Sequence, residues 1–458
     1  MFETVPDFSD RETSLTIETS LVDLFKQRNP NDEIFYFRSM KVRNFEDGHA
    51  FVEFHYNFAN ESDFVSSLTI DFELGDDEVT RSILFSIGMN VALWYFMGFA
   101  TCKFVIEKDV AEISIEMLQY WQDFYDNILL EYFHVNKIKH GVILESECRT
   151  SSRLHVVTNE KSHSHVSLRN DIIVPLGGGK DSLVAWHLCI EAGKNPVLLY
   201  VADGLYEYEG SWRLQRIVKE TNSTVHIFRH DFHSELFERR AKSYLTPCGH
   251  PWAALVYYDS LLLGFLTGIK EVSLGHEKSA DFGNGIMLNG LEVNHQYDKS
   301  SDFLYKATEY KAHAIFGCEN FDSQNCKGSD FSPQSSPQSS PQSSPSSKRS
   351  CIEIFSAVGN LHEIEIAKIF CQEPSLRRFH SIFLSCNEPL DNTRWCAKCP
   401  KCAFVYLIMS AWLDPPAVWA LFGENLFECT DIQHIFLSLL GADHFKPFEC
   451  VGTFQGNT

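Results

Sequence analysis

Between residues 172 and 182 the chain runs Ile172-Ile173-Val174-Pro175-Leu176-Gly177-Gly178-Gly179-Lys180-Asp181-Ser182. The apolar first half contains β-branched residues and predicts a buried parallel strand, and residues 183–188 after the glycines predict a helix. A glycine turn between a strand and a helix gathers backbone N–H groups at the positive end of the helix. Because glycine has no β-carbon, a ligand can approach this backbone closely. The segment therefore predicts a phosphate-binding loop.

Two common phosphate-binding motifs do not fit this loop. A Walker loop has Ser or Thr directly after its lysine, but Lys180 is followed by Asp181, and the third glycine of the dinucleotide fingerprint is missing. The order Gly-Gly-x-Asp-Ser instead resembles the PP-loop ATP pyrophosphatases, which cleave ATP between the α and β phosphates. An ordinary glycine-rich turn is the alternative interpretation.

The PP-loop resemblance implies a role for each residue of the loop. The residues expected to bind ATP and its pyrophosphate are Gly177, Gly178, Gly179, Lys180, Asp181 and Ser182. Asp181 would hold Mg²⁺, Ser182 would bond the pyrophosphate, and Lys180 would add positive charge. The serine that usually opens the motif is Gly177 here, so bare backbone replaces one hydroxyl contact.

Composition limits the class of protein. The 458 residues suffice for two or three domains, and a formal net charge of -22 argues against nucleic acid as a partner, because phosphate contacts need a basic surface. Residues 1–10 have neither the basic nor the apolar region of a secretory signal, and fourteen irregularly spaced cysteines are typical of reduced thiols. We therefore expect a cytoplasmic protein.

The uncharged residues 82–102 reach the length of a membrane span. They contain Asn90 and two glycines, their flank at residues 76–78 is acidic, and no basic cluster marks an inside end. A helix buried in a protein core explains this segment better, so no membrane span is expected.

The patterns predict two domains of different class. An N-terminal α+β domain, residues 1–145, is indicated by three antiparallel strands, the apolar helix and a second helix with core aromatic residues, at residues 33–40, 49–57, 66–72, 82–102 and 113–133. A polar linker follows at residues 146–170. Strands and helices then alternate through residues 171–458, which predicts an α/β fold with a doubly wound parallel sheet. The Ser-Pro-Gln repeats at residues 332–347 predict a disordered insertion.

Four cysteines predict a metal site. Cys386 is followed after nine residues by Cys396-Ala397-Lys398-Cys399-Pro400-Lys401-Cys402. Thiolates at this spacing can wrap a tetrahedral Zn²⁺, and the two lysines would offset their negative charge. Structural zinc is favoured, with an iron–sulfur cluster or no metal as alternatives.

Two further segments contain candidate functional residues. Gly275-His276-Glu277-Lys278 follows a predicted strand, at the sheet edge where ligands bind in such folds. Residues 294–300, Asn294-His295-Gln296-Tyr297-Asp298-Lys299-Ser300, are more polar than a core element should be. A helix start with a solvated face is the alternative, but a substrate site is favoured.

Taken together, these segments resemble the UDP-N-acetylmuramoyl-L-alanyl-L-glutamate epimerases, the MurL family. The matching segments are residues 177–182, 276–280, 293–300, 395–404 and 447–452. The resemblance implies inversion of the terminal L-glutamate of a UDP-linked muramoyl dipeptide through an acyl-adenylate, with ATP cleaved to AMP and pyrophosphate. The Ser-Pro-Gln insertion departs from the family pattern.

The implied reaction needs proton-transfer groups and a binding surface. An adenylated carboxylate makes the neighbouring Cα–H more acidic, so that a base can remove the proton and an acid can return it on the other face. The candidate groups for proton transfer are His276, Lys278, His295 and Lys299, and the candidates for binding the substrate are Glu277, Asn294, Gln296 and Ser300.

Two other functions stay open at this point. One is modification of a nucleobase or tRNA, because deazaguanine nitrile synthases and tRNA-thiolating enzymes also combine a PP-loop with cysteines; the acidic charge disfavours it. The other is a non-catalytic sensor of adenine nucleotides, which Asp181 disfavours, since a binder does not need a carboxylate that holds a metal.

Overall fold

The computed structural model describes residues 34–58, 63–97, 103–138, 141–147, 149–150, 170–234, 248, 250–318, 351–386, 394–442, 448–449 and 451–452. Most of the predicted linker and the whole Ser-Pro-Gln insertion, residues 332–347, lie outside the described residues.

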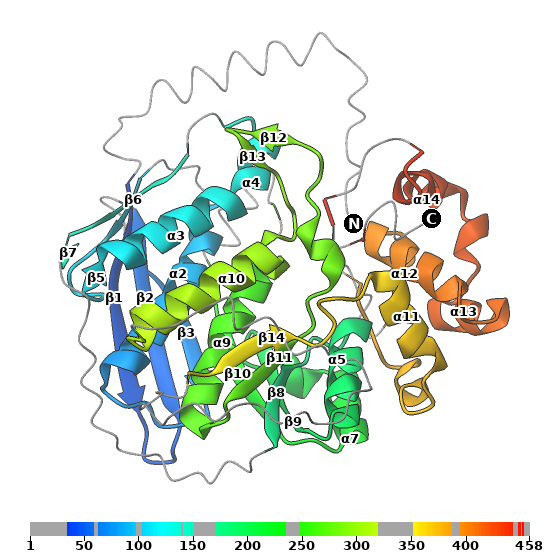
Figure 1. The fold of residues 1–458 in the computed structure, drawn as a ribbon, viewed down its shortest axis with the longest axis horizontal. Helices are drawn as coiled ribbons and strands as arrows, with labels where there is room; N and C mark the ends of the chain where they lie inside the picture. The colour runs from blue at the N-terminus through cyan, green and yellow to red at the C-terminus, as the bar shows by residue number, and fades with distance from the viewer. Residues whose placement is uncertain are drawn as a thin grey trace, which may run out of the picture.

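Ten of the described strands form one mixed sheet (Figure 1). From one edge to the other they are β14 (Glu353–Ser356), β11 (Glu271–Leu274), β8 (Asp171–Pro175), β9 (Asn195–Asp203), β10 (Val225–Asp231), β3 (Phe64–Ile70), β2 (Ala50–Phe58), β1 (Ile34–Asn44), β4 (Lys103–Ile106) and β6 (Ile143–Ser146). Two short ribbons pair β5 (Ile113–Ser114) with β7 (Arg149–Thr150) and β12 (Met287–Leu288) with β13 (Leu291–Glu292). The protein is therefore α/β.

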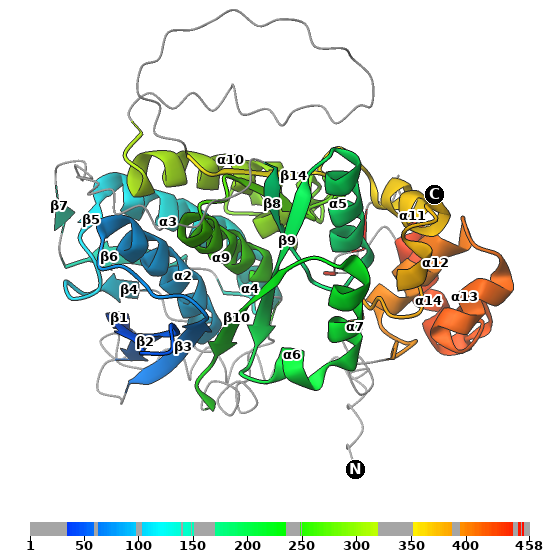
Figure 2. The same cartoon turned by 90° about the horizontal axis from the view of Figure 1, so that it is seen from below.

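The strands β14, β11, β8, β9 and β10 run parallel, as the sequence predicts. Alternate residues of β8 enter different cores, because successive side chains of a strand point to opposite faces. Ile172 and Val174 pack on one face with α5 (Lys180–Glu191), α7 (Trp212–Thr221) and α11 (Glu363–Gln372). Ile173 packs on the other face with α2 (Glu78–Phe96) and α9 (Trp252–Thr267) (Figure 2). Helices cover both faces, which explains the uninterrupted apolar run.

The predicted N-terminal strands are antiparallel, and they extend the same sheet. β3 pairs with β10 in antiparallel register, with Thr69 opposite Arg229. A doubly wound parallel arrangement therefore describes one half of a larger mixed sheet. The division into two domains at residue 145 stays a prediction, because strands from both sides of that boundary share one sheet.

The apolar segment at residues 82–102 belongs largely to α2, which is buried over nearly its whole length. Asp77 caps this helix by accepting a hydrogen bond from the Thr80 backbone N–H at 2.9 Å. Among the described helices, none combines the length and the apolar character that crossing a bilayer requires. The helix predicted at residues 113–133 divides at Leu129 into α3 (Ile115–Ile128) and α4 (Leu130–Val135).

The C-terminal helices gather on one side of the sheet, beyond α5 (Figure 1). They are α11, α12 (Pro400–Ser410), α13 (Pro415–Phe422) and α14 (Gln433–Leu439). Their core includes the last two cysteines of the predicted metal motif, Cys399 and Cys402. Val174 and Leu176, which precede the glycine loop, lie in the same core. The cysteine segment and the glycine loop are thus parts of one packed unit.

Short elements complete the described chain. They are α6 (Glu207–Gly210), η2 (Lys278–Asp281), η3 (Tyr297–Lys299), α10 (Ser301–Tyr310), η4 (Lys311–Ile315), η6 (Arg377–Phe379), η7 (Leu426–Glu428) and η8 (Thr430–Ile432).

Candidate functional site

The glycine loop connects the end of β8 to the start of α5, as predicted. Gly178 has a φ of +75°, which glycine adopts without strain, and Gly179 is the N-cap of α5. A β-carbon added to Gly178 would lie 2.8 Å from Nη1 of Arg213. Gly177 differs, because a β-carbon there would meet no atom within 4 Å. The loop therefore packs tightly at Gly178 and is open at Gly177.

The loop after β11 lies against the first turn of α5. A β-carbon on Gly275 would lie 3.2 Å from the backbone nitrogen of Ser182, so only glycine allows this approach. Ser356 Oγ donates to the carbonyl oxygen of His276 at 2.7 Å and ties the same loop to the end of β14. The structure therefore brings the predicted phosphate loop and residues 276–278 together at the carboxyl ends of neighbouring strands.

Lys180 is buried at the start of α5, with 3% of its surface exposed. Its ammonium group forms an ion pair with Asp181. Burial disfavours the charged form, but the carboxylates of Asp181, Glu277 and Glu363 outweigh burial and raise the pKa of Lys180. The ammonium group of Lys180 therefore stays protonated and is paired with Asp181.

Glu277 is buried, and one of its oxygens, Oε2, has no hydrogen-bond partner among the described residues. Burial opposes its ionisation, but Lys299, Lys180 and Lys401 overcome that effect and lower its pKa. Positive charges from the η3 segment, the glycine loop and α12 thus act on one carboxylate.

Glu363, at the start of α11, is a second buried carboxylate that the sequence analysis missed. It accepts a hydrogen bond from Ser279 Oγ, and the Lys278 backbone N–H donates to the carbonyl of Leu361 at 3.0 Å in the same contact. Burial and the nearby charge of Glu277 raise the pKa of Glu363. Two neighbouring carboxylates with opposite pKa shifts are typical of functional sites, where one stays charged and the other can carry a proton.

His276 and Lys299 come from separate predicted segments and lie close enough to interact electrostatically. Burial, helped by the positive charge of Lys299, lowers the pKa of His276 to about 3. The Nδ1 atom of His276 is buried without a hydrogen-bond partner in the described part of the chain, as are both amide atoms of Gln296. Buried polar atoms without a hydrogen bond are rare in proteins unless a ligand or a water molecule bonds to them. His276 is therefore a neutral imidazole whose Nδ1 is open to a bond from a ligand or a water.

Other predicted residues have local partners. His295 Nδ1 lies 2.6 Å from Oε2 of Glu131 in α4, a carboxylate that the sequence analysis also missed. Asn294 Nδ2 donates to the carbonyl of Ala280 at 2.8 Å. The Ser300 hydroxyl caps α10, and Lys278 has an exposed side chain.

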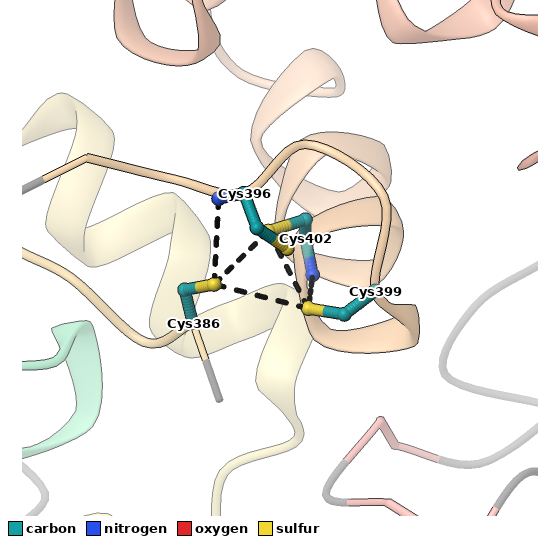
Figure 3. A group of neighbouring side chains, drawn as sticks. All are labelled: Cys386, Cys396, Cys399 and Cys402. Carbon is teal, nitrogen blue, oxygen red and sulfur yellow. Dashed lines mark hydrogen bonds between the residues drawn. The ribbon is translucent and has the colours of Figure 1, made fainter. Parts of the chain in front are cut away.

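Four cysteines form the metal-binding group that the spacing predicts (Figure 3). Within the described residues, their sulfur atoms all lie within 4.8 Å of one another, and Figure 3 shows the side chains converging. Four of the Sγ–Sγ distances are 3.9 Å for Cys386–Cys399, 3.6 Å for Cys396–Cys402, 3.5 Å for Cys399–Cys402 and 3.6 Å for Cys402–Cys386. These cysteines could hold a metal ion.

The arrangement suits a reaction on an anionic substrate. The predicted phosphate loop, with its buried lysine, adjoins a neutral imidazole, a second lysine and two carboxylates, and several of their polar atoms have no partner in the described chain. Groups of these kinds can bind anionic ligands and transfer protons.

Comparisons with known proteins identify the family that the chain resembles. The family model described as the MurL N-terminal domain matches residues 27–321, and the one described as the MurL C-terminal domain matches residues 382–458. A protein of Xanthomonas oryzae pv. oryzae named UDP-N-acetyl-alpha-D-muramoyl-L-alanyl-L-glutamate epimerase is 26% identical over 294 residues, which are 63% of this chain and 55% of that protein. Proteins of the same name from a Micromonospora species and Salinispora tropica are each 25% identical, over 79% and 72% of this chain and 70% and 62% of their own length. The chain thus spans little more than half of the Xanthomonas relative.

The neutral state of buried His276 predicts a pH dependence of stability. Between pH 6.5 and pH 5 the unfolded chain binds a proton at this histidine, whereas the folded protein does not until about pH 3, so acid favours unfolding. Over this interval wild type should lose up to about 2 kcal/mol more unfolding free energy than a His276→Gln variant. Urea unfolding at both pH values measures the difference, with exposed His434→Gln as the control. If the unfolding free energy changed equally with pH in His276→Gln and His434→Gln, the neutral state of His276 would be contradicted.

Proposed function

Since this chain belongs to the MurL family, we propose that it inverts the terminal L-glutamate of UDP-N-acetylmuramoyl-L-alanyl-L-glutamate to D-glutamate. The proposal includes dependence on ATP, an acyl-adenylate intermediate, release of AMP and pyrophosphate, and a PP-loop fold for the parallel half of the sheet. Such a reaction belongs to peptidoglycan precursor synthesis.

One observation carries the proposal. The predicted phosphate loop and the predicted proton-transfer residue His276 meet at adjacent strand ends, where Gly275 packs on the first turn of α5. A reaction that couples nucleotide cleavage to proton transfer requires this proximity.

The chemistry explains why ATP is needed. Removing the Cα proton beside a free carboxylate would place two negative charges on neighbouring atoms. Adenylation converts the carboxylate to a neutral acyl group, so that the carbanion delocalises as an enolate. A protein base then removes the proton, a protein acid returns one to the opposite face, and water releases AMP.

The glycine-loop residues would bind the phosphates. Backbone N–H groups at the start of α5 and the ammonium of Lys180 would face the negative charge. Asp181 would hold Mg²⁺, which neutralises charge on the phosphates when it is bound. In the structure Lys180 and Asp181 neutralise each other, so both would exchange this contact for ligand atoms.

Among the candidate bases, His276 and Lys299 fit proton transfer better than Lys278. His276 and Lys299 interact with each other, and Lys299 also interacts with Glu277, whereas the Lys278 side chain is exposed. His295, held by Glu131, is the candidate for the opposite face of the glutamate. Lys299 and His295 both stabilise the negative charge of Asp298, so the two groups share one neighbourhood.

The substrate-binding candidates separate into two groups. Glu277 and Gln296 keep buried polar atoms without partners in the described chain, and these atoms can contact the dipeptide. Asn294 and Ser300 already bond neighbouring groups and would shape the segment that presents His295 and Lys299.

We assign structural Zn²⁺ to the four cysteines. A tetrahedron with Zn–S bonds of about 2.3 Å has edges of about 3.8 Å. The four sulfur separations given above, 3.5 to 3.9 Å, match these edges. Sulfur atoms this close also leave no room for the several irons of an iron–sulfur cluster.

The central prediction concerns isotope exchange. Purified protein with ATP, Mg²⁺ and the L-glutamate dipeptide nucleotide in D₂O should place deuterium on the Cα of a D-glutamate product, with AMP and pyrophosphate formed. Exchange should require ATP, because side-chain bases cannot remove the proton of an unactivated Cα–H efficiently. Chiral analysis and mass spectrometry measure the product.

Each of the two alternative functions predicts a different result in this assay. An enzyme that modifies nucleobases would form AMP only with its own base or tRNA and would leave the dipeptide unlabelled. A nucleotide sensor would form no AMP at all. Deuterium incorporation without ATP would contradict the adenylate.

An Asp181→Asn variant should lose AMP formation by about 100-fold or more, because a neutral amide holds Mg²⁺ poorly. The fold should persist, since Glu277 and Glu363 still offset the charge of Lys180. The control is Glu191→Gln, which removes a carboxylate at the other end of α5. Turnover near wild type in Asp181→Asn would contradict the metal-holding role.

The metal assignment predicts about one Zn²⁺ per chain. A Cys399→Ser variant should lose the metal and melt at a lower temperature, because zinc binding stabilises the folded state. Elemental analysis and thermal unfolding measure both effects. Cys429→Ser, outside the four-cysteine group, should keep the zinc; iron in fresh wild-type protein would refute the assignment.

A further inference from the structure

The chain that leads into the cysteine site passes directly along the glycine loop. The Leu384 backbone N–H donates to the carbonyl of Gly178 at 3.0 Å. Nη1 of Arg213 in α7 donates to the same carbonyl at 3.3 Å and to the carbonyl of Ile382 at 3.4 Å. Arg213 is buried, so this bridge is shielded from water. Residues 382–384 are thereby fastened to the loop.

The next residue, Ser385, presents its hydroxyl to Gly179. A β-carbon on Gly179 would lie 2.6 Å from Ser385 Oγ, closer than these atoms can approach. The glycine at this position therefore makes room for the serine hydroxyl. In a loop built to bind a ligand, a side chain so close to the helix N-cap is placed to contact that ligand.

The hydroxyl oxygen of Ser385 lacks a hydrogen bond in the described part of the chain. The atom is buried and has no hydrogen-bond partner within the described residues. A buried hydroxyl without a partner costs free energy, and most such groups in proteins are bonded. A ligand oxygen at the loop would satisfy it.

The first glycine of the loop, Gly177, provides no side-chain hydroxyl. A serine usually opens this motif, whereas Gly177 offers no hydroxyl, and the space where its side chain would stand contains no atom within 4 Å. A ligand bound at the loop therefore meets bare backbone at this end.

We propose that Ser385 donates its hydroxyl hydrogen to a phosphate oxygen held at the glycine loop, and so supplies the contact that Gly177 cannot make. The inference rests on the proposed function, since the phosphate is the pyrophosphate part of ATP. It assigns a ligand-binding role to a residue more than 200 positions away from the loop in the sequence.

The four-cysteine site then has a second role beside stability. Ser385 directly precedes Cys386, whose Sγ accepts a hydrogen bond from the Cys396 backbone N–H at 3.5 Å. One side of Ser385 is thus held by the glycine loop through Leu384, and the other by the cysteine group. A bound metal would fix the position of the hydroxyl.

The test uses magnesium pyrophosphate as the probe and titration calorimetry as the readout. Ser385→Ala should bind it about 10- to 100-fold more weakly than wild type, the range expected for losing one hydrogen bond to a charged group. Ser381→Ala, an exposed serine of the same segment, is the matched control and should bind like wild type. Binding by Ser385→Ala within twofold of wild type would overturn the proposal.

A relocated hydroxyl gives a second, independent test. Gly177→Ser should restore the affinity of Ser385→Ala, because the position has space for a side chain and a φ outside the left-handed region. Failure of the double variant to regain affinity would contradict the idea that the two positions serve one contact. Circular dichroism establishes that each variant is folded.

The two proposals fail separately. Wild type that binds no pyrophosphate and forms no AMP would refute the proposed function. Wild type that binds it, with Ser385→Ala equally tight, would refute only the role of Ser385.

Discussion

The close approach of backbone segments around the glycine loop is the constraint on which the site depends. Gly178 admits the guanidinium of Arg213, Gly179 admits the hydroxyl of Ser385, and Gly275 admits the first turn of α5. Each contact joins the loop to a different part of the chain: α7, the cysteine segment and the end of β11. A β-carbon at any of these three glycines would force the neighbouring group away, so the missing side chains allow the parts to meet.

Buried charges follow from this crowding. Lys180, Glu277 and Glu363 all lie where water is nearly excluded, and an isolated charge there would be strongly destabilising. They offset one another: the carboxylates keep Lys180 charged, and lysines from three segments keep Glu277 ionised. Oε2 of Glu277, Nδ1 of His276 and both amide atoms of Gln296 have no partner in the described chain, which suits a site completed by its substrate.

The continuous sheet gives the N-terminal half a direct part in the site. Because β3 pairs with β10, the helices that pack on the N-terminal strands also lie against those of the parallel half. Glu131 of α4 thereby reaches His295, so a carboxylate from the first third of the chain orients a candidate base from the second. From the other side, Ser385 beside the cysteine group approaches Gly179, and Lys401 of α12 helps to lower the pKa of Glu277.

The sequence by itself determined the local features: the strand, glycine turn and helix of residues 172–191, the buried rather than membrane-spanning α2, and the convergence of four cysteines at metal-site spacing. These depend on short-range periodicity and spacing, which the sequence displays directly. Only the tertiary structure decided that the N-terminal strands extend the parallel sheet, because backbone pairing of β3 with β10 leaves no side-chain pattern. It also decided that Glu131, Arg213, Glu363 and Ser385 lie beside the predicted site residues. Each is an ordinary residue in its own segment, and its role arises where segments far apart in the sequence pack together.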